Sequence, residues 1–443
     1  MLSNLSELIE RNRIDPELYE LYGVKRGLRN NNGTGVLVGL TEIGEVHGYI
    51  MDDNEKIPSK GRLQYRGINI KHIVNGFQKD GRKGFEEVCY LLLFGKLPNL
   101  EELLQFNEMI GSFRSLPSNF TEDMILKIPS NDIMNKLARS ILVLYSHDNN
   151  PDDTSIKNVL RQSIELIAKF PTLVAYGYQA KSHYYHNNSL YIHSPKAELG
   201  AAENILYMIR PDNSYTQTEA EILDLSLVLH AEHGGGNNSA FVTHVVSSTG
   251  TDTYSAIAAA VGSLKGPKHG GANIKVIQMM KDLERNIKNW DNKVEIKAYL
   301  FKLLRKEAFD KSGLIYGIGH AIYTISDPRA LLLKEKAAEL AKEKDRFDEY
   351  KLYELVEELS KEALSEFRNL NSPVCANVDF YSGFVYDMLN IPWELYTPIF
   401  AVARIVGWCA HRIEELIGPQ KIIRPAYKSV AERKPYTPIR ERD

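Results

Sequence analysis

Four glycine-flanked clusters in this chain carry the side chains best suited to acid–base chemistry. They span residues 229–237 (LHAEHGGGN), 266–273 (GPKHGGAN), 317–329 (GIGHAIYTISDPR) and 377–383 (NVDFYSG). Each presents a titratable group where glycines allow a ligand to come close to the backbone. Histidines, one carboxylate and arginines suit the removal of a proton next to a carbonyl group, because hydrogen bonds can stabilise the enolate oxygen. We therefore predict a single acid–base site built from these clusters.

The third cluster predicts a binding site for an anion. Two glycines permit a sharp turn before His320. Asp327 suits the N-cap of a helix, and Pro328 suits its first position. Arg329 would then project from the first helical turn, where a cation is unfavourable unless an anion binds nearby. We predict that this arginine receives a carboxylate or a phosphate.

Other reaction classes fit the sequence less well. The HGGG at residues 233–236 imitates an esterase oxyanion hole, but the chain has no G-x-S-x-G nucleophile motif. His230, Glu232 and His233 could bind a metal, yet H-x-x-H without H-E-x-x-H is weak evidence for zinc. Neither a phosphate-binding loop nor a dinucleotide fingerprint is present. A single histidine is more often structural than functional, an interpretation that applies to His47, His72, His147, His183, His186, His193, His230 and His411.

The overall composition excludes several partner classes. The chain has 443 residues and a net charge of −3, so neither nucleic acid nor an anionic membrane is expected as its main partner. Its three cysteines lack C-x-x-C spacing, which argues against a disulfide scaffold and is typical of a reducing compartment. No apolar run approaches the roughly 20 residues needed to span a bilayer. We expect a soluble, cytoplasmic protein.

Helical patterns dominate the chain and would position the four clusters. Short strands are predicted only near the N-terminus, at residues 35–40, 46–51 and 62–65, where β-branched residues alternate with glycines. Helices are predicted from residue 15, at 85–94, 156–169, 172–181, 198–209, 218–233, 253–264, 274–285, 293–309, 328–343, 350–369, 384–389 and 395–416. The segment Thr218–Glu221 is taken as a capping box, and the basic tail from Ala426 as poorly ordered. The predicted fold class is all-α, with a few short N-terminal strands.

In their order along the chain, these clusters resemble the citrate synthase family. The series is H-x-[DE]-H before glycines and Asn, then G-P-x-H-G-G-A-N, G-x-G-H with D-P-R, and N-V-D-F-Y-S-G. Further matches are YRG at 65–67, EVCYLLLFG at 87–95 and AEN at 202–204. The resemblance extends from the strand region through Arg424. It implies condensation of acetyl-CoA with oxaloacetate, followed by hydrolysis of citryl-CoA.

The resemblance also implies a role for each matching residue. Asp379 would remove a proton from the acetyl methyl group, His269 would donate a hydrogen bond to the thioester oxygen, and His320 would polarise and protonate the oxaloacetate carbonyl. The oxaloacetate carboxylates would be held by His233, Arg329, Arg404 and Arg424. It further implies acetyl-CoA as co-substrate, no permanently bound cofactor and no metal.

The family architecture implies two domains and a homodimer. A large domain would comprise residues 1–271 and 384–443, and a smaller inserted domain would comprise residues 272–383. Glycines near Gly270, Gly271 and Gly383 would act as hinges, allowing the cleft to close over oxaloacetate and exclude water. Arg424 would reach the neighbouring subunit's site. Whether the chain instead forms a hexamer regulated by a nucleotide stays open, as does the role of the N-terminal helix.

The contacts to coenzyme A and the acyl preference stay open. Bacterial relatives often carry cations at the positions of Ala321 and Thr324, so contacts to the CoA phosphates must come from elsewhere. The candidates are Lys265, Lys268 and Lys311. The alternative within the family is 2-methylcitrate synthase, which uses propionyl-CoA, because one methylene in a pocket contributes only about 1–3 kcal/mol. A catalytically inactive binding protein and, less favoured, a citryl-CoA lyase are further alternatives.

Overall fold

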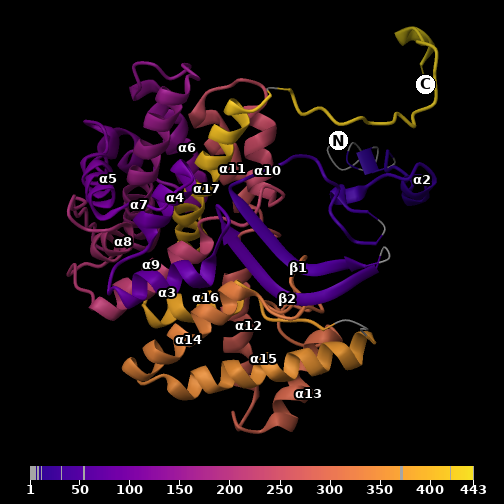
Figure 1. The fold of residues 1–443 in the computed structure, drawn as a ribbon. Coiled ribbons are helices and arrows are strands. Elements are labelled where there is room, and N and C mark those ends of the chain that lie inside the picture. The colour runs from indigo at the N-terminus through magenta and orange to yellow at the C-terminus, as the bar shows by residue number, and fades with distance from the viewer. Residues whose placement is uncertain are drawn as a thin grey trace.

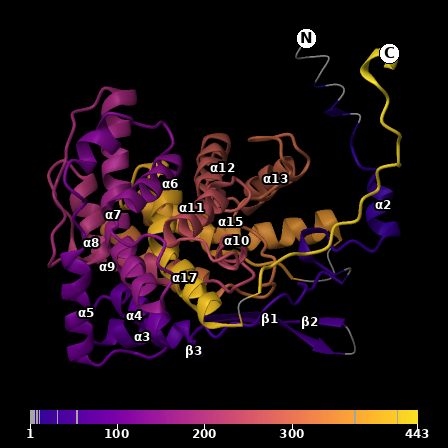
Figure 2. The ribbon, with the colours of Figure 1, turned by 90° about the horizontal axis from the view of Figure 1, so that it is seen from above.

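The protein folds into a mainly helical body from which two arms extend, an N-terminal arm at residues 12–40 and a C-terminal arm at residues 421–442 (Figures 1 and 2). The computed structural model describes residues 6, 9–10, 12–30, 32–52, 55–369, 373–419 and 421–442. The mainly helical fold class with a few short N-terminal strands is confirmed. No helix within these residues is long and apolar enough to cross a membrane.

One small antiparallel sheet lies near the N-terminus. Strand β1 (Gly44–Asp52) pairs with β2 (Glu55–Tyr65), and β2 pairs with the short β3 (Ile68–Asn69). The register runs from Gly44 opposite Tyr65 to Asp52 opposite Glu55. The strands predicted at 46–51 and 62–65 are therefore confirmed. The strand predicted at 35–40 is wrong, because Leu37 and Leu40 are exposed and no described strand pairs with this segment.

A first group of helices surrounds α17 (Tyr396–Ile417), which is buried along almost its whole length (Figure 1). It packs against α4, α6, α7, α9, α10 and α11. The members of this group are α3 (Ile70–Lys79), α4 (Phe85–Phe94), α5 (Leu100–Ser112), α6 (Ile133–Leu144), α7 (Ile156–His186), α8 (Ala201–Ile209), α9 (Gln217–His230), α10 (Asn238–Ser247) and α11 (Thr253–Lys265). Apolar residues such as Trp408 and Ile405 on α17 therefore form the centre of the core.

A second group of helices packs below the first in Figure 1. It contains α12 (Ala272–Asn286), α13 (Lys293–Leu304), α14 (Pro328–Glu343), α15 (Phe347–Arg368) and α16 (Val378–Met388). α16 lies against both α12 and α14, while α15 covers α13 and α14. A Cβ atom at Gly383 would lie 2.8 Å from the backbone oxygen of Asn273, so this glycine permits close packing of α16 on α12. Contacts of α14 and α16 with α9 join the two groups.

The remaining elements are short. In the N-terminal arm lie α2 (Pro16–Leu21) and a turn of 3₁₀-helix at Arg26–Leu28. Asp15 accepts a hydrogen bond from the Glu17 N–H at 2.9 Å, so the predicted helix start is confirmed. Single turns also occur at Thr121–Leu126, Tyr145–His147, Trp393–Leu395 and Ile439–Glu441. The tail after α17 is extended and mostly exposed.

Several predicted helix boundaries are wrong. α7 continues through Pro171, which lies buried inside it, so the predicted break before this residue is absent. The capping box of α9 is formed by Thr216 and Glu219, two residues before the predicted start, and the helix ends at His230. α13 ends at Leu304, because Lys306 and its neighbours adopt turn conformations instead of continuing to residue 309. The helices at 85–94 and 328–343 have the predicted limits.

Candidate active site

The loop that carries His320 packs against the ring of His233. The two imidazoles lie 5.2 Å apart, centroid to centroid, in an edge-to-face arrangement. The Tyr323 ring stacks on His320 at 4.6 Å and lies 5.6 Å from His233. His233 follows the end of α9, and His320 precedes α14. The first and third sequence clusters are therefore in contact.

The β1–β2 hairpin supports the His320 loop from outside. A Cβ atom at Gly48 of β1 would lie 2.6 Å from the backbone oxygen of Ile322. A Cβ atom at Gly61 of β2 would collide with the backbone oxygen of Ser326. The Gly61 N–H donates to the Ser326 hydroxyl at 3.3 Å. Two glycines thus allow the hairpin to lie directly on the loop and fix its path.

Backbone hydrogen bonds determine which nitrogen of His320 carries the proton. The N–H groups of Ile322 and Tyr323 both donate to His320 Nδ1, at 3.0 and 3.1 Å. Nδ1 must therefore hold a lone pair, and the proton of the neutral ring lies on Nε2. Burial and the charge of Arg329 lower the pKa of His320 to about 4. At neutral pH this side chain is an uncharged hydrogen-bond donor.

Arg329 is neutralised by Asp327, contrary to the expectation that its charge waits for an anion. The N-cap carboxylate accepts from Arg329 N and Nε, both at 3.0 Å, and from Nη2 at 2.7 Å. Both side chains are almost fully buried. Asp327 also accepts the Val378 N–H at 3.2 Å, which ties the start of α16 to the start of α14. The charge of this arginine is therefore balanced before any ligand binds.

Arg404, in contrast, has unpaired donors in the interior. Its Nε donates to the backbone oxygen of His230 at 2.6 Å. Among the described residues, Nη1 and Nη2 have no hydrogen-bond partner although both are buried. The same is true of His233 Nε2. An unpaired buried cation is strongly unfavourable, so this arrangement favours a bound carboxylate.

Asp379 lies in the first turn of α16, which begins at Val378 and not at residue 384 as predicted. Asn377 caps the helix by accepting the Asp379 N–H at 3.0 Å. Burial raises the pKa of the Asp379 carboxyl to about 6, although the charges of Arg329 and Arg404 oppose this rise. A carboxylate with a raised pKa is a stronger base than a fully hydrated one and still ionises at neutral pH.

His269 lies between α11 and α12, close enough to Arg404 to be affected by its charge. Its Nε2 lies 3.1 Å from the Ser239 hydroxyl, which also accepts a hydrogen bond from Trp408 Nε1 at 3.0 Å. Burial and the charge of Arg404 lower the pKa of His269 to about 4. Ser239 therefore holds an uncharged imidazole in a fixed orientation.

The remaining candidates lie outside this cluster. Arg424 is exposed in the C-terminal tail. Lys265 forms an ion pair with Asp132 at 3.3 Å, while Lys268 and Lys311 are exposed. His230 Nδ1 lies 2.7 Å from the Ser226 carbonyl and Glu232 pairs with His411, so the metal set of His230, Glu232 and His233 does not converge.

Sequence reasoning missed the residues that orient the reactive groups. Tyr65 donates to the backbone oxygens of Val228 and Glu232, at 2.9 and 3.2 Å, and so fixes the end of α9. Asp327 was assigned only as an N-cap, although its two-residue spacing from Arg329 allows the ion pair observed. No local signal marks Ser239, because its role depends on contacts with the distant His269 and Trp408. Tyr323 stacks on His320 within the same loop, but its contact with the distant His233 arises only in the fold.

Curated relatives match nearly the whole chain. The family described as "Citrate synthase, C-terminal domain" matches residues 30–426. A citrate synthase from Synechocystis sp. is 35% identical over 387 residues, covering 86% of this chain and 88% of the relative. The 2-methylcitrate synthase 1 of Corynebacterium glutamicum is 32% identical over 428 residues, covering 95% and 98%.

Solved structures share the fold. Citrate synthase from Pyrobaculum aerophilum superposes with a TM-score of 0.74 at 29% identity, covering 92% of this chain and 94% of that one. The Thermoplasma acidophilum citrate synthase, solved as a ternary complex with carboxymethyl coenzyme A and oxaloacetate, gives a TM-score of 0.75 at 25% identity and covers 95% and 99%. With the family match over residues 30–426, these similarities show that the chain belongs to the citrate synthase family.

Proposed function

We propose that the cluster of His233, His269, His320, Asp379 and Arg404 condenses acetyl-CoA with oxaloacetate and water to give citrate and CoA. Membership of the citrate synthase family supports this reaction. The observation that carries the assignment of the site is the set of buried nitrogens without partners, Arg404 Nη1 and Nη2 and His233 Nε2. The ring of His233 contacts that of His320, an uncharged donor, and the charge of Arg404 acts on Asp379, the carboxylate base.

Oxaloacetate would supply hydrogen-bond acceptors for the unpaired donors. One carboxylate would bind the Arg404 guanidinium, because arginine forms paired hydrogen bonds with carboxylates. The second would lie near Arg329 and His233, whose ring contacts the His320 loop. The ketone oxygen then faces His320 Nε2–H, which is the donor left by the backbone bonds to Nδ1.

Enolisation of acetyl-CoA needs both a base and an oxyanion donor. Asp379 removes a methyl proton while His269 donates a hydrogen bond to the thioester oxygen, which stabilises the enol. One such donor contributes roughly 3–4 kcal/mol to transition-state stabilisation. The enol carbon attacks the ketone carbon, and the ketone oxygen takes a proton from His320. Hydrolysis of the thioester then releases citrate and CoA.

Thiol release with two acyl donors tests this function. Steady-state CoA release is measured with oxaloacetate plus acetyl-CoA, then with propionyl-CoA, and Asp379→Ala serves as the blank. The three cysteines are buried, so they add little to the thiol signal. A large preference for acetyl-CoA supports citrate synthase. No turnover with either donor, despite oxaloacetate binding, would favour a binding protein instead.

Use of propionyl-CoA is the second candidate activity. It is supported by the 32% identity to a 2-methylcitrate synthase over 95% of the chain. Comparable or better rates with propionyl-CoA would move the assignment to that reaction. Lys265, Lys268 and Lys311 stay candidates for CoA contacts, and their alanine variants should raise KM for acetyl-CoA without changing KM for oxaloacetate. The absence of a resident cofactor and a cytoplasmic location stay predictions.

The two groups of helices support a division into residues 1–271 with 384–443 and residues 272–383. The second boundary falls inside α16, so Gly383 is a packing glycine within a helix and any hinge there must bend α16. Oxaloacetate should draw the two parts together, because its two carboxylates bind groups from both. X-ray scattering should show a smaller radius of gyration with oxaloacetate. An unchanged radius would contradict domain closure.

A further inference from the structure

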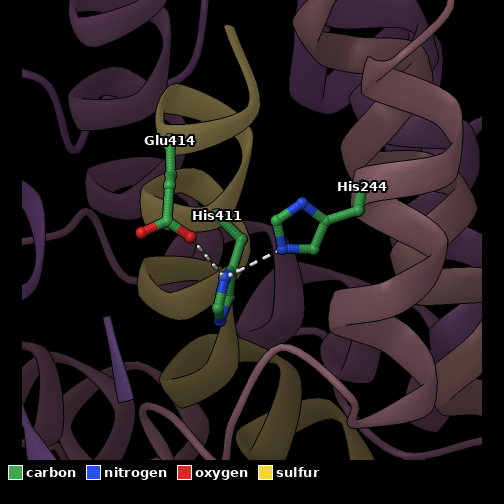
Figure 3. Close-up of side chains that lie close together, drawn as sticks. All are labelled: His244, His411 and Glu414. Carbon is green, nitrogen blue, oxygen red and sulfur yellow. Dashed lines mark hydrogen bonds and ion pairs between the residues drawn. The ribbon is translucent and has the colours of Figure 1, made fainter. Parts of the chain in front are cut away.

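A second histidine cluster lies where α10 meets the end of α17 (Figure 3). His244 Nε2 lies 3.1 Å from His411 Nδ1. Glu414 Oε2 lies 3.7 Å from the same Nδ1 and, among the described residues, has no hydrogen-bond partner. The three atoms lie within 4.8 Å of one another. The roles proposed for the active site use none of these side chains.

Carboxylates hold the outer nitrogens of both histidines. His411 Nε2 lies 3.0 Å from Glu232 Oε1, and His244 Nδ1 lies 2.8 Å from Glu415 Oε2. A carboxylate only accepts hydrogen bonds, so each outer nitrogen carries a proton. If both rings are neutral, their inner nitrogens present lone pairs to each other at 3.1 Å. Such a pair is stable only with a cation between the rings.

We propose that His244, His411 and Glu414 bind a divalent transition-metal ion such as Zn²⁺. Two histidines and a carboxylate form a common zinc ligand set that leaves a fourth position for water. With metal–nitrogen bonds of about 2.05 Å, nitrogens 3.1 Å apart subtend about 98° at the ion, near the tetrahedral value. A carboxylate behind each ligating histidine is the usual second shell of such sites. The side chains of His244 and Glu414 are 14% and 23% exposed, so both lie nearer the surface than His411, which is fully buried.

A proton is the competing occupant of this site. The Glu232 carboxylate beside Nε2 favours a charged His411 ring. His411 could then donate from Nδ1 to His244 Nε2 and satisfy both rings. A metal ion would have to displace this proton from between the two rings.

The site is linked to the glycine loop of the active site through Glu232. The same Oε1 that pairs with His411 accepts the Gly234 N–H, and Gly234 follows His233. A Cβ atom at Gly407 would collide with Glu232 Oε2, so the carboxylate is tightly enclosed. A bound ion would therefore constrain the residue next to a proposed oxaloacetate ligand. The metal site itself does not depend on the proposed reaction.

Calorimetric titration of the chelator-treated full chain with Zn²⁺ tests the proposal. We expect one equivalent per chain with the wild type, and at least tenfold weaker binding for His244→Ala and Glu414→Gln, because even a lost second-shell partner weakens metal binding about 10–100-fold. Glu415→Gln, which changes the carboxylate behind His244, should weaken Zn²⁺ binding by about 10–100-fold. His72→Ala, which removes an exposed histidine on α3, should bind like the wild type.

Cobalt provides a second readout that does not depend on activity. Co²⁺ should give the intense visible absorption of a four-coordinate site in the wild type, and lose it in His244→Ala. Circular dichroism verifies that each variant is folded. Absence of stoichiometric binding, unchanged binding in folded His244→Ala and Glu414→Gln, or binding removed only by His320→Ala would each overturn the proposal.

Discussion

The raised pKa of Asp379 should appear in the pH dependence of catalysis. The carboxylate form is the base, so kcat/KM should rise with pH through about 6 and level off above it. His269 and His320 have pKa values of about 4 and stay neutral throughout this range. Initial rates measured from about pH 5 to pH 8 check this expectation. An acid limb near pH 4 would show that Asp379 is not the titrating base.

Asp379→Asn should remove turnover while stabilising the fold at neutral pH. Because burial raises the pKa of this carboxyl, the folded state holds its proton more tightly than the unfolded state. Ionisation therefore destabilises the native protein as pH rises from about 4 to 6 and above. Asparagine cannot ionise, so its free energy of unfolding should exceed that of the wild type at neutral pH. Below pH 4 the two proteins should differ little in denaturant titrations.

Asp327→Ala should destabilise the protein far more than removal of an ordinary helix cap. The substitution leaves the buried Arg329 guanidinium without its counter-ion. The free energy of unfolding should therefore fall by about 3–5 kcal/mol. Asp15→Ala is the matched control, because Asp15 also caps a helix with proline at its first position but is exposed. Asp15→Ala should lower the free energy of unfolding by at most about 1 kcal/mol. Similar free energies of unfolding for both variants would show that the ion pair contributes little.

The types of residue in the site could be predicted from sequence, but their protonation and pairing could not. The order of the four clusters was sufficient to select His269, His320 and Asp379 as candidates. The tautomer of His320 depends on two backbone N–H groups that only the folded loop presents to Nδ1. The unpaired donors of Arg404 depend on α17 lying against the end of α9. The contact of Arg404 with His230 joins residues 174 positions apart, and the His320 bonds, although local, need the turn that the folded loop makes.

At the scale of elements, the hairpin should control catalysis through the loop it supports. Gly48→Ala pushes a methyl group against the Ile322 carbonyl, which should destabilise the fold by about 1–3 kcal/mol and displace His320. We expect kcat to fall in a protein that still binds oxaloacetate. Gly76→Ala on α3 is the control, because no atom lies near its added Cβ. It should leave kcat unchanged and stabilise the fold slightly. Equal kcat values in the two variants would contradict the supporting role.

Helix limits were predicted correctly where the stop signals are local. Gly95 ends α4 in a left-handed conformation, and Asp327 with Pro328 starts α14. Pro171 is also a local signal, but it misled the prediction because surrounding helices hold α7 continuous across it. The segment 35–40 has the composition of a strand, but its described pairing is limited to a single bridge between Gly35 and Arg29. Tertiary context decided both cases.

At the scale of the whole molecule, we propose a homodimer in which Arg424 completes the neighbouring site. The arms expose Leu40 and Tyr427 at 90% and 95%, so each presents large apolar side chains to a partner. Mixing unfolded Asp379→Asn and Arg424→Ala chains and refolding them tests the arrangement. If Arg424 acts in the partner's site, hybrid dimers contain one intact site, and random pairing should restore about a quarter of wild-type activity. No recovery would mean that Arg424 acts in its own chain's site or that hybrids do not form, and native mass spectrometry separates these outcomes.

The central position of α17 also constrains how the chain matures during synthesis. Six helices that precede α17 in the chain, and so leave the ribosome before it, pack against this helix. Until α17 emerges, the apolar faces of α7 and α11 lack the helix against which they pack. The nascent chain is then a long intermediate with exposed apolar surface, prone to association with chaperones. Arg404 arrives on the same helix, so the protein acquires its stable core and its substrate cation in one late step. Truncation before residue 396 should therefore give an aggregated chain and not a folded, inactive one.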